Sequence, residues 1–117
     1  MSINIFRKPV IVEIEGKEYD FVLDFESAIV FQDLYGESVF VGIDKITKDQ
    51  DLKALACLVA SCLKDKETFK CVGMNFVKGI DLITGLPFFT DKLADLMTAS
   101  LPENDEKDKK KQKQKTT

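Results

Sequence analysis

The chain has 117 residues, with 17 lysines and arginines against 20 aspartates and glutamates, a net charge of −3 and no histidine. The missing histidine removes the commonest general base and the commonest neutral metal ligand, which excludes Ser-His-Asp triads and histidine-based zinc hydrolases. The longest uncharged apolar stretch, residues 54–63, is about half as long as a bilayer crossing requires, and no apolar segment of signal-peptide length follows the N-terminus, so we expect a cytosolic protein without a membrane span.

Charge divides the chain into two parts. Residues 1–102 carry 11 basic and 16 acidic side chains, a net charge of −5, whereas residues 103–117 carry 6 against 4, a net charge of +2. The second part consists of Glu, Asn, Asp, Lys, Gln and Thr, a composition that cannot offset the entropy lost on ordering. We therefore predict one folded domain over residues 1–102 and a disordered charged tail over residues 103–117.

Residues 10–24 alternate as a β-hairpin does. The residues of its predicted inner face are apolar in both strands, namely Val10, Val12, Ile14, Tyr19, Phe21 and Leu23. Glu15-Gly16-Lys17 supplies the turn between the two strands. Because a lone hairpin is marginal in water, this one must pack on helices or find a further strand.

A first helix is expected from Phe25 to Tyr35, with Asp24 as its N-cap and Gly36 as the residue that ends it. Residues 38–46 have no clear period and fit either a short helix or an extended link. Thr47 and Gln50 resemble a capping box, after which apolar residues recur at three- and four-residue steps to about residue 64. The second predicted helix is the strongest of the set.

A polar connection is expected over residues 64–67, followed by a third helix from Thr68 to Ile80. Gly85-Leu86-Pro87 is expected to break the chain, so that the last helix has Thr90 as its cap and ends at Pro102. The predicted fold class is α+β, with the N-terminal β-hairpin packed on a bundle of about four helices.

Residue types that carry chemistry occur here in patterns that favour structural roles. Cys57, Cys62 and Cys71 lack the paired short spacings of zinc or redox motifs and are expected to be reduced core residues. Carboxylates of the hairpin alternate with core residues, as a solvated face does, and Asp44, Asp49 and Asp51 lack the central glycine and closing glutamate of a calcium loop. No glycine-rich phosphate loop occurs. We predict no catalytic residue, cofactor or metal site, and hence not an enzyme.

Aromatic residues exceed what an obvious helix packing needs, which points to a protein-binding surface. The candidates for a client-binding or self-association surface are Val10, Val12, Tyr19, Phe21, Phe40, Phe76, Phe88 and Phe89. The unpaired edges of the hairpin also invite strand addition from a second copy, which predicts a homo-oligomer.

The lysine-rich tail offers an alternative function. Residues 107–115 could bind nucleic acid or an acidic protein, but they lack arginine and interleaved aromatic residues, so a solvated tail is favoured. Binding of nucleic acid by the acidic domain is also disfavoured. A small regulatory or nucleic-acid-associated module that acts through this tail is the alternative to a protein-binding domain.

The order of segments resembles a known family. The hairpin and first helix, VEIEGKEYDFVLDFESAIVFQDLYGES, precede DLKALACLVASCLK, FKCVGMNFVKGIDLI and a last helix before the charged tail. This order is similar to that of the tail assembly chaperones of long-tailed, siphovirus-type bacteriophages. In that family a glycine-lysine hairpin leads into a helix that ends at a glycine, and the matching positions here are Gly16, Lys17, Tyr19, Leu23, Asp24, Phe25 and Gly36. The likeness covers nearly the whole chain but lies mostly at structural positions.

The resemblance implies a function for the chain. Such a protein would bind the tape measure protein, keep that long helical chain soluble and help to recruit tail tube subunits. It would act in the cytoplasm of the bacterial host and would be absent from the mature virion.

Overall fold

The computed structural model describes residues 8–99, so the predicted tail over residues 103–117 and the expected end of the last helix at Pro102 lie outside the described residues. Three short strands and five helices follow one another in the order β1 (Val10–Ile14), β2 (Lys17–Phe21), α1 (Phe25–Tyr35), α2 (Val39–Asp49), α3 (Leu52–Cys62), β3 (Leu63–Asp65), α4 (Gly73–Lys78) and α5 (Leu82–Ala99). The α+β class is confirmed. The hairpin is, however, part of a three-stranded sheet, and the helices number five among the described residues.

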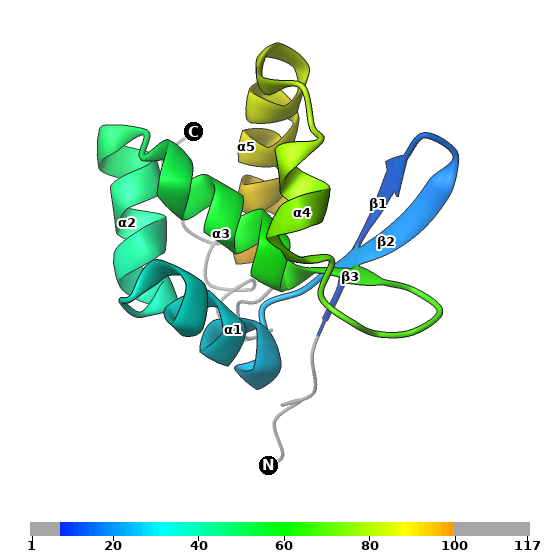
Figure 1. Cartoon of the computed structure of the whole chain (residues 1–117), viewed down its shortest axis with the longest axis horizontal. Coiled ribbons are helices and arrows are strands. Elements are labelled where there is room, and N and C mark those ends of the chain that lie inside the picture. The colour runs from blue at the N-terminus through cyan, green and yellow to red at the C-terminus, as the bar shows by residue number, and fades with distance from the viewer. Residues whose placement is uncertain (1–7, 100–117) are drawn as a thin grey trace, which may run out of the picture.

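Helix α3 lies at the centre of the molecule (Figure 1), with α1 running along it, α2, α4 and α5 packed against it, and the sheet continuing from its C-terminus. Eight of its eleven residues are buried, including Leu58, which is fully enclosed. The hairpin projects from this helical body with Val12, Tyr19 and Phe21 turned into the core. The predicted inner face of the hairpin is therefore confirmed for these three residues.

The hairpin turn contains Glu15 and Gly16, both with positive φ (50° and 80°), so Lys17 already belongs to the second strand. Two consecutive residues in the left-handed region form the tight turn whose twist matches that of the strands. Val10 faces Phe21 and Val12 faces Tyr19 across the two strands, a register that places the predicted inner-face residues of both strands on one side of the sheet.

The first helix begins and ends where the sequence predicts. The Asp24 carboxylate accepts a hydrogen bond from the Ser27 backbone N–H (2.8 Å), and the Ser27 hydroxyl accepts one from the Asp24 backbone N–H (3.1 Å). Together they form a reciprocal capping box at the N-terminus of α1. Gly36 ends the helix with φ of 90°.

Residues 38–46, for which the sequence left two alternatives, belong to a helix. The Ser38 hydroxyl accepts from the Val41 backbone N–H at 3.3 Å and caps α2. The capping box expected at Thr47 and Gln50 is wrong, because Thr47 lies inside α2 and Gln50 ends it with φ of 53°. The N-cap of α3 is Asp51, whose carboxylate accepts from the Ala54 backbone N–H at 3.1 Å.

The predicted polar connection over residues 64–67 is wrong in its first half, because residues 63–65 form a strand that pairs with β2. The third helix expected from Thr68 is also wrong. Backbone bonds from Val72 N–H to Leu63 O (2.9 Å) and from Asp65 N–H to Lys70 O (2.9 Å) fold residues 70–72 back along β3. Because residues 70–72 pair with β3, they do not belong to the predicted helix, and α4 is only six residues long.

The predicted break at Gly85-Leu86-Pro87 is wrong, since α5 begins at Leu82 and contains Pro87. The Asp81 carboxylate accepts from the Thr84 backbone N–H at 2.9 Å and so takes the capping role expected of Thr90. A proline at the sixth helical residue forfeits one backbone hydrogen bond near the helix start. Burial of Phe89, Leu93 and Leu96 on one side of α5 offsets this loss.

Candidate functional site

Several ionisable groups of the hairpin and its surroundings, namely Asp20, Asp24 and Asp51, have structural partners. Burial alone would raise the pKa of Asp24, but hydrogen bonds from Ser27 and from Lys64 outweigh it and lower that pKa to about 2. The Asp20 carboxylate lies 3.4 Å from the Lys66 ammonium group, and Asp51 caps α3 and accepts from the Tyr35 hydroxyl at 2.9 Å. No group of three or more potential metal ligands occurs within residues 8–99.

The three cysteines are free thiols, with Cys57 and Cys62 buried and Cys71 half-buried. Burial raises the pKa of all three, and that of Cys62 reaches about 12. The Cys71 thiol donates to the Ser61 carbonyl oxygen at 3.1 Å. At neutral pH these side chains are therefore protonated, as expected of core residues.

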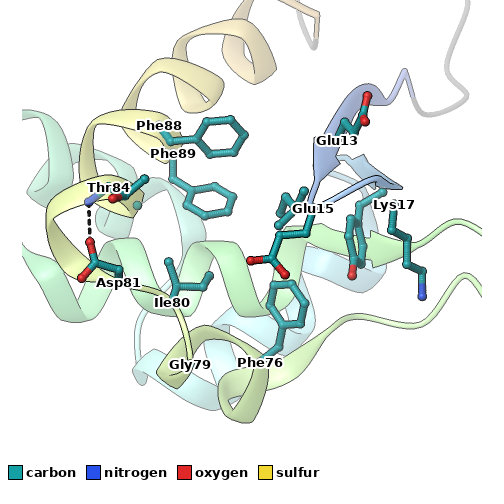
Figure 2. A pocket seen from close by; sticks show the side chains of 13 residues that line it. Glu13, Glu15, Lys17, Phe76, Gly79, Ile80, Asp81, Thr84, Phe88 and Phe89 are labelled. Carbon is teal, nitrogen blue, oxygen red and sulfur yellow. Dashed lines mark hydrogen bonds between the residues drawn. The ribbon is translucent and has the colours of Figure 1, made fainter.

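A groove of about 760 Å³ lies between the tip of the hairpin and the corner where α4 joins α5 (Figure 2). We call it the hairpin groove. Residues 13–19 form one wall and residues 76–89 form the other. The full lining is Glu13, Ile14, Glu15, Lys17, Tyr19, Phe76, Gly79, Ile80, Asp81, Thr84, Gly85, Phe88 and Phe89.

Aromatic rings form most of the apolar lining. The rings of Tyr19 and Phe76 meet edge to face with centroids 5.5 Å apart, and those of Phe88 and Phe89 do so at 5.0 Å. In Figure 2 the rings of Phe88 and Phe89 face the hairpin across the groove, with Ile80 and Phe76 below them. Rings fixed by such contacts present a preorganised apolar surface.

Acidic side chains border the hairpin groove. Glu13 and Glu15 lie exposed at the hairpin tip, and Asp81 is exposed at the opposite wall. Hydrogen bonds from the backbone N–H and the side chain of Thr84 lower the pKa of Asp81, so it is ionised at neutral pH. The lysine of the lining, Lys17, is bound to Asp65 at 2.7 Å. The hydrogen bond between them raises the pKa of Lys17 and lowers that of Asp65 to about 2, so the pair stays ionised and mutually neutralised.

A second, smaller groove of about 200 Å³ lies on the other side of the same corner, between α3, α4 and the start of α5. The two grooves share Ile80, Asp81, Gly85 and Phe89. Large apolar side chains beside the second groove are well exposed: Leu52 49%, Leu82 56%, Ile83 81% and Leu86 38%. We call these four residues the corner surface.

The residues predicted to form one binding surface do not lie together in the structure. Val12, Tyr19, Phe21 and Phe89 belong to the core, with exposed fractions from 0% to 8%, because they are the inward-facing residues of the sheet and of α5. They cannot form an open surface, although Tyr19 and Phe89 reach the lining of the hairpin groove.

Of the remaining candidates, Phe76 and Phe88 are half-buried residues of the hairpin groove, and Val10 packs at the edge of the core. Phe40 is 71% exposed on α2 and lines neither groove. The corner surface was missed. The sequence did contain a signal for the corner surface. Residues 80–89 have more apolar side chains than one buried face of a helix can accommodate, which indicates that some of them are exposed.

No protein-family model, curated protein or solved structure matches the chain at a significant level. Within residues 8–99, no helix combines the length and the apolar character needed to cross a bilayer.

Proposed function

We propose that the chain is a non-catalytic assembly chaperone that binds an apolar helical segment of a client protein. Following the resemblance to phage tail assembly chaperones, the proposed client is the tape measure protein, with tail tube subunits as further partners. The proposed place of action is the cytoplasm of the bacterial host, with no copy left in the mature virion. The observation that carries the proposal is the corner surface, four exposed aliphatic side chains of which three line the second groove.

The corner surface is suited to binding on energetic grounds. Fully burying a leucine side chain contributes about 1.5–3 kcal/mol, so covering four that are already partly buried contributes roughly 4 kcal/mol in all. Loss of translational and side-chain freedom consumes a comparable amount on association. Useful affinity therefore requires the client to fill the adjoining grooves as well, which a helix with apolar residues on one face can do.

Self-association is a second element of the proposal, and the sheet restricts it to one strand edge of the hairpin. The hairpin was expected to have two unpaired edges. In the structure β3 pairs with β2, so the β2 edge is not open. The remaining hairpin edge is that of β1, where Ile11 is 47% exposed. An exposed edge strand can pair with a second copy.

Co-expression tests the proposal. The proposed partner is a long helical protein encoded beside this chain, and we expect the chain to raise its soluble fraction and to co-purify with it at 0.5 M NaCl. A double variant, Leu82→Gln with Leu86→Gln, should abolish both effects. Ile29→Gln with Val41→Gln is a matched control, because these side chains are 59% and 37% exposed against 56% and 38%.

Three outcomes contradict the proposal. Absence of a gene for such a long helical protein would remove the phage assignment. Equal loss in both double variants would remove the corner surface from the binding site. Binding that disappears at 0.5 M NaCl or on deletion of residues 103–117 would instead support a module acting through its lysine-rich tail.

A further inference from the structure

We propose that the hairpin groove selects a client helix whose apolar face is flanked by lysines or arginines. This inference rests on the proposed function, because it names the chemistry of the client segment. The juxtaposition that carries it is an aromatic groove with carboxylates on both walls.

The charges around the groove are unbalanced. Glu13 and Glu15 stand on the hairpin and Asp81 on the helical wall, and all three are exposed. Glu13 faces Glu18 across the hairpin, and Glu18 lies 3.8 Å from the Lys66 ammonium group, so Glu18 adds no unbalanced charge. The Glu15 carboxylate points into the groove toward Ile80 and Phe76 (Figure 2), so a cation in the groove would lie beside a negative charge that is unpaired among the described residues.

The lysines near the groove are already paired with carboxylates. Lys17 is bound to Asp65 at 2.7 Å, and Lys92, whose ammonium group lies 5.5 Å from the centre of the Phe88 ring, is 4.0 Å from Asp95. Lys78 precedes Gly79 in the chain but does not line the groove. Charge complementarity therefore favours a cationic partner over an anionic one.

The apolar walls favour a helix over an extended segment. An extended chain laid against Phe76, Ile80 and Phe88 would turn backbone N–H and C=O groups toward carbon without hydrogen-bond partners, which costs free energy. A helix satisfies these groups internally and offers only side chains. Lysine and arginine also have long apolar stems, so their stems can lie along the aromatic walls while their charged ends reach the carboxylates.

The test uses the full chain and two 18-residue amphipathic peptides. One has leucine on its apolar face and lysine on its polar face, the other has glutamate in place of every lysine, and each carries one tryptophan. Because the chain contains no tryptophan, the emission of the peptide reports binding without background. We expect the lysine peptide to bind at least tenfold more tightly at 50 mM NaCl, and the ratio to fall as salt is added.

Matched variants locate the charge effect. Glu13→Gln with Glu15→Gln should reduce the ratio of affinities to about threefold or less. Asp33→Asn with Glu37→Gln removes the same charge from exposed positions on and just beyond the C-terminal end of α1, which do not line the groove, and should leave the ratio unchanged. Circular dichroism establishes that each variant is folded.

The outcomes separate this inference from the proposed function. Equal binding of both peptides, with loss of both in the Leu82→Gln, Leu86→Gln variant, would overturn the cationic preference and leave an apolar client site. An equal drop of the ratio in both acidic-residue variants would overturn the assignment to this groove. A gain of more than tenfold on deleting residues 103–117 would mean that the chain's own tail occupies the groove. Binding of neither peptide would contradict both proposals.

Discussion

Replacing Lys64 with methionine should cost the fold about 2 kcal/mol. The side chain of Lys64 is 1% exposed, and its ammonium group bonds Asp24 at 2.9 and 3.2 Å and Glu26 at 2.6 Å. These contacts attach β3 to the start of α1. Burial on its own lowers the pKa of Lys64, but the bonds to Glu26 and Asp24 outweigh it and raise that pKa, so the group is charged.

The size of the effect follows from what the variant leaves behind. Removing one partner of a buried ion pair costs about 3–5 kcal/mol when the other charge stays without compensation. Here Glu26 is 62% exposed and can be hydrated, while Asp24, 19% exposed, keeps both of its bonds from Ser27. Methionine also preserves most of the packing of the lysine stem. We therefore expect about 2 kcal/mol, or roughly 8–16 °C in Tm for a domain of this size.

Acid should narrow this difference. The pKa of Asp24 in the folded state, about 2, is below its ordinary value of 3.8, so its contribution to stability is complete above pH 4 and is lost as pH falls toward 2. Hydrogen bonds from Ser27 account for more of that lowering than Lys64 does, and they persist in the variant, so only the part due to Lys64 distinguishes the two chains. A protonated Asp24 no longer attracts Lys64, so the difference in unfolding free energy between the wild-type chain and the Lys64→Met variant should shrink between pH 4 and pH 2.

Urea unfolding followed by far-ultraviolet circular dichroism measures both effects. The control is Lys48→Met, which removes the same charge from a 72% exposed side chain paired with 58% exposed Asp44 at 3.1 Å. An exposed pair contributes about 0–1 kcal/mol, so the control should change little. A Lys64→Met variant within 0.5 kcal/mol of wild type at pH 7, or a control equally destabilised, would refute this reasoning.

Three further predictions concern packing, the last helix and the thiols. Gly42→Ala should destabilise by about 1–3 kcal/mol in urea, because its Cβ would overlap the enclosed ring of Phe31; an unchanged midpoint would show that the ring can move. Pro87→Ala should raise Tm, since it restores a helical backbone donor worth on the order of 1 kcal/mol or more, and a lower Tm would mean that the proline ring is needed for packing. Ellman's reagent at pH 8 should label half-buried Cys71 well before buried Cys62, and the reverse order would contradict the burial described here.

Elements that depend on neighbouring residues were predictable. The hairpin turn needs only Glu15 and Gly16 in the left-handed region, and α1 needs only the bonds between Asp24 and Ser27 and the glycine at its end. Each of these interactions spans at most four positions in the chain. Composition and local spacing therefore contain enough information to locate them.

Elements that depend on distant residues were not predictable in the same way. Residues 63–65 are too short and polar to resemble a strand, yet Leu63 pairs with Phe21 and Asp65 with Tyr19, partners more than 40 positions away. The lysine between them is tolerated in the interior because Asp24 and Glu26 neutralise it. Proline within α5 is likewise compatible with a helix because packing of that helix on the core outweighs one lost hydrogen bond.

The sequence by itself determined the α+β class, the hairpin, the limits of α1 and the presence of the apolar helix that became α3, since periodicity and caps are local properties. Only the tertiary structure decided which aromatic residues are buried and which line a groove. The hairpin groove joins residues 13–19 to residues 76–89, and the corner surface joins Leu52 to the start of α5. No local pattern contains both walls, because their proximity arises from the packing of α3, α4, α5 and the sheet around one core.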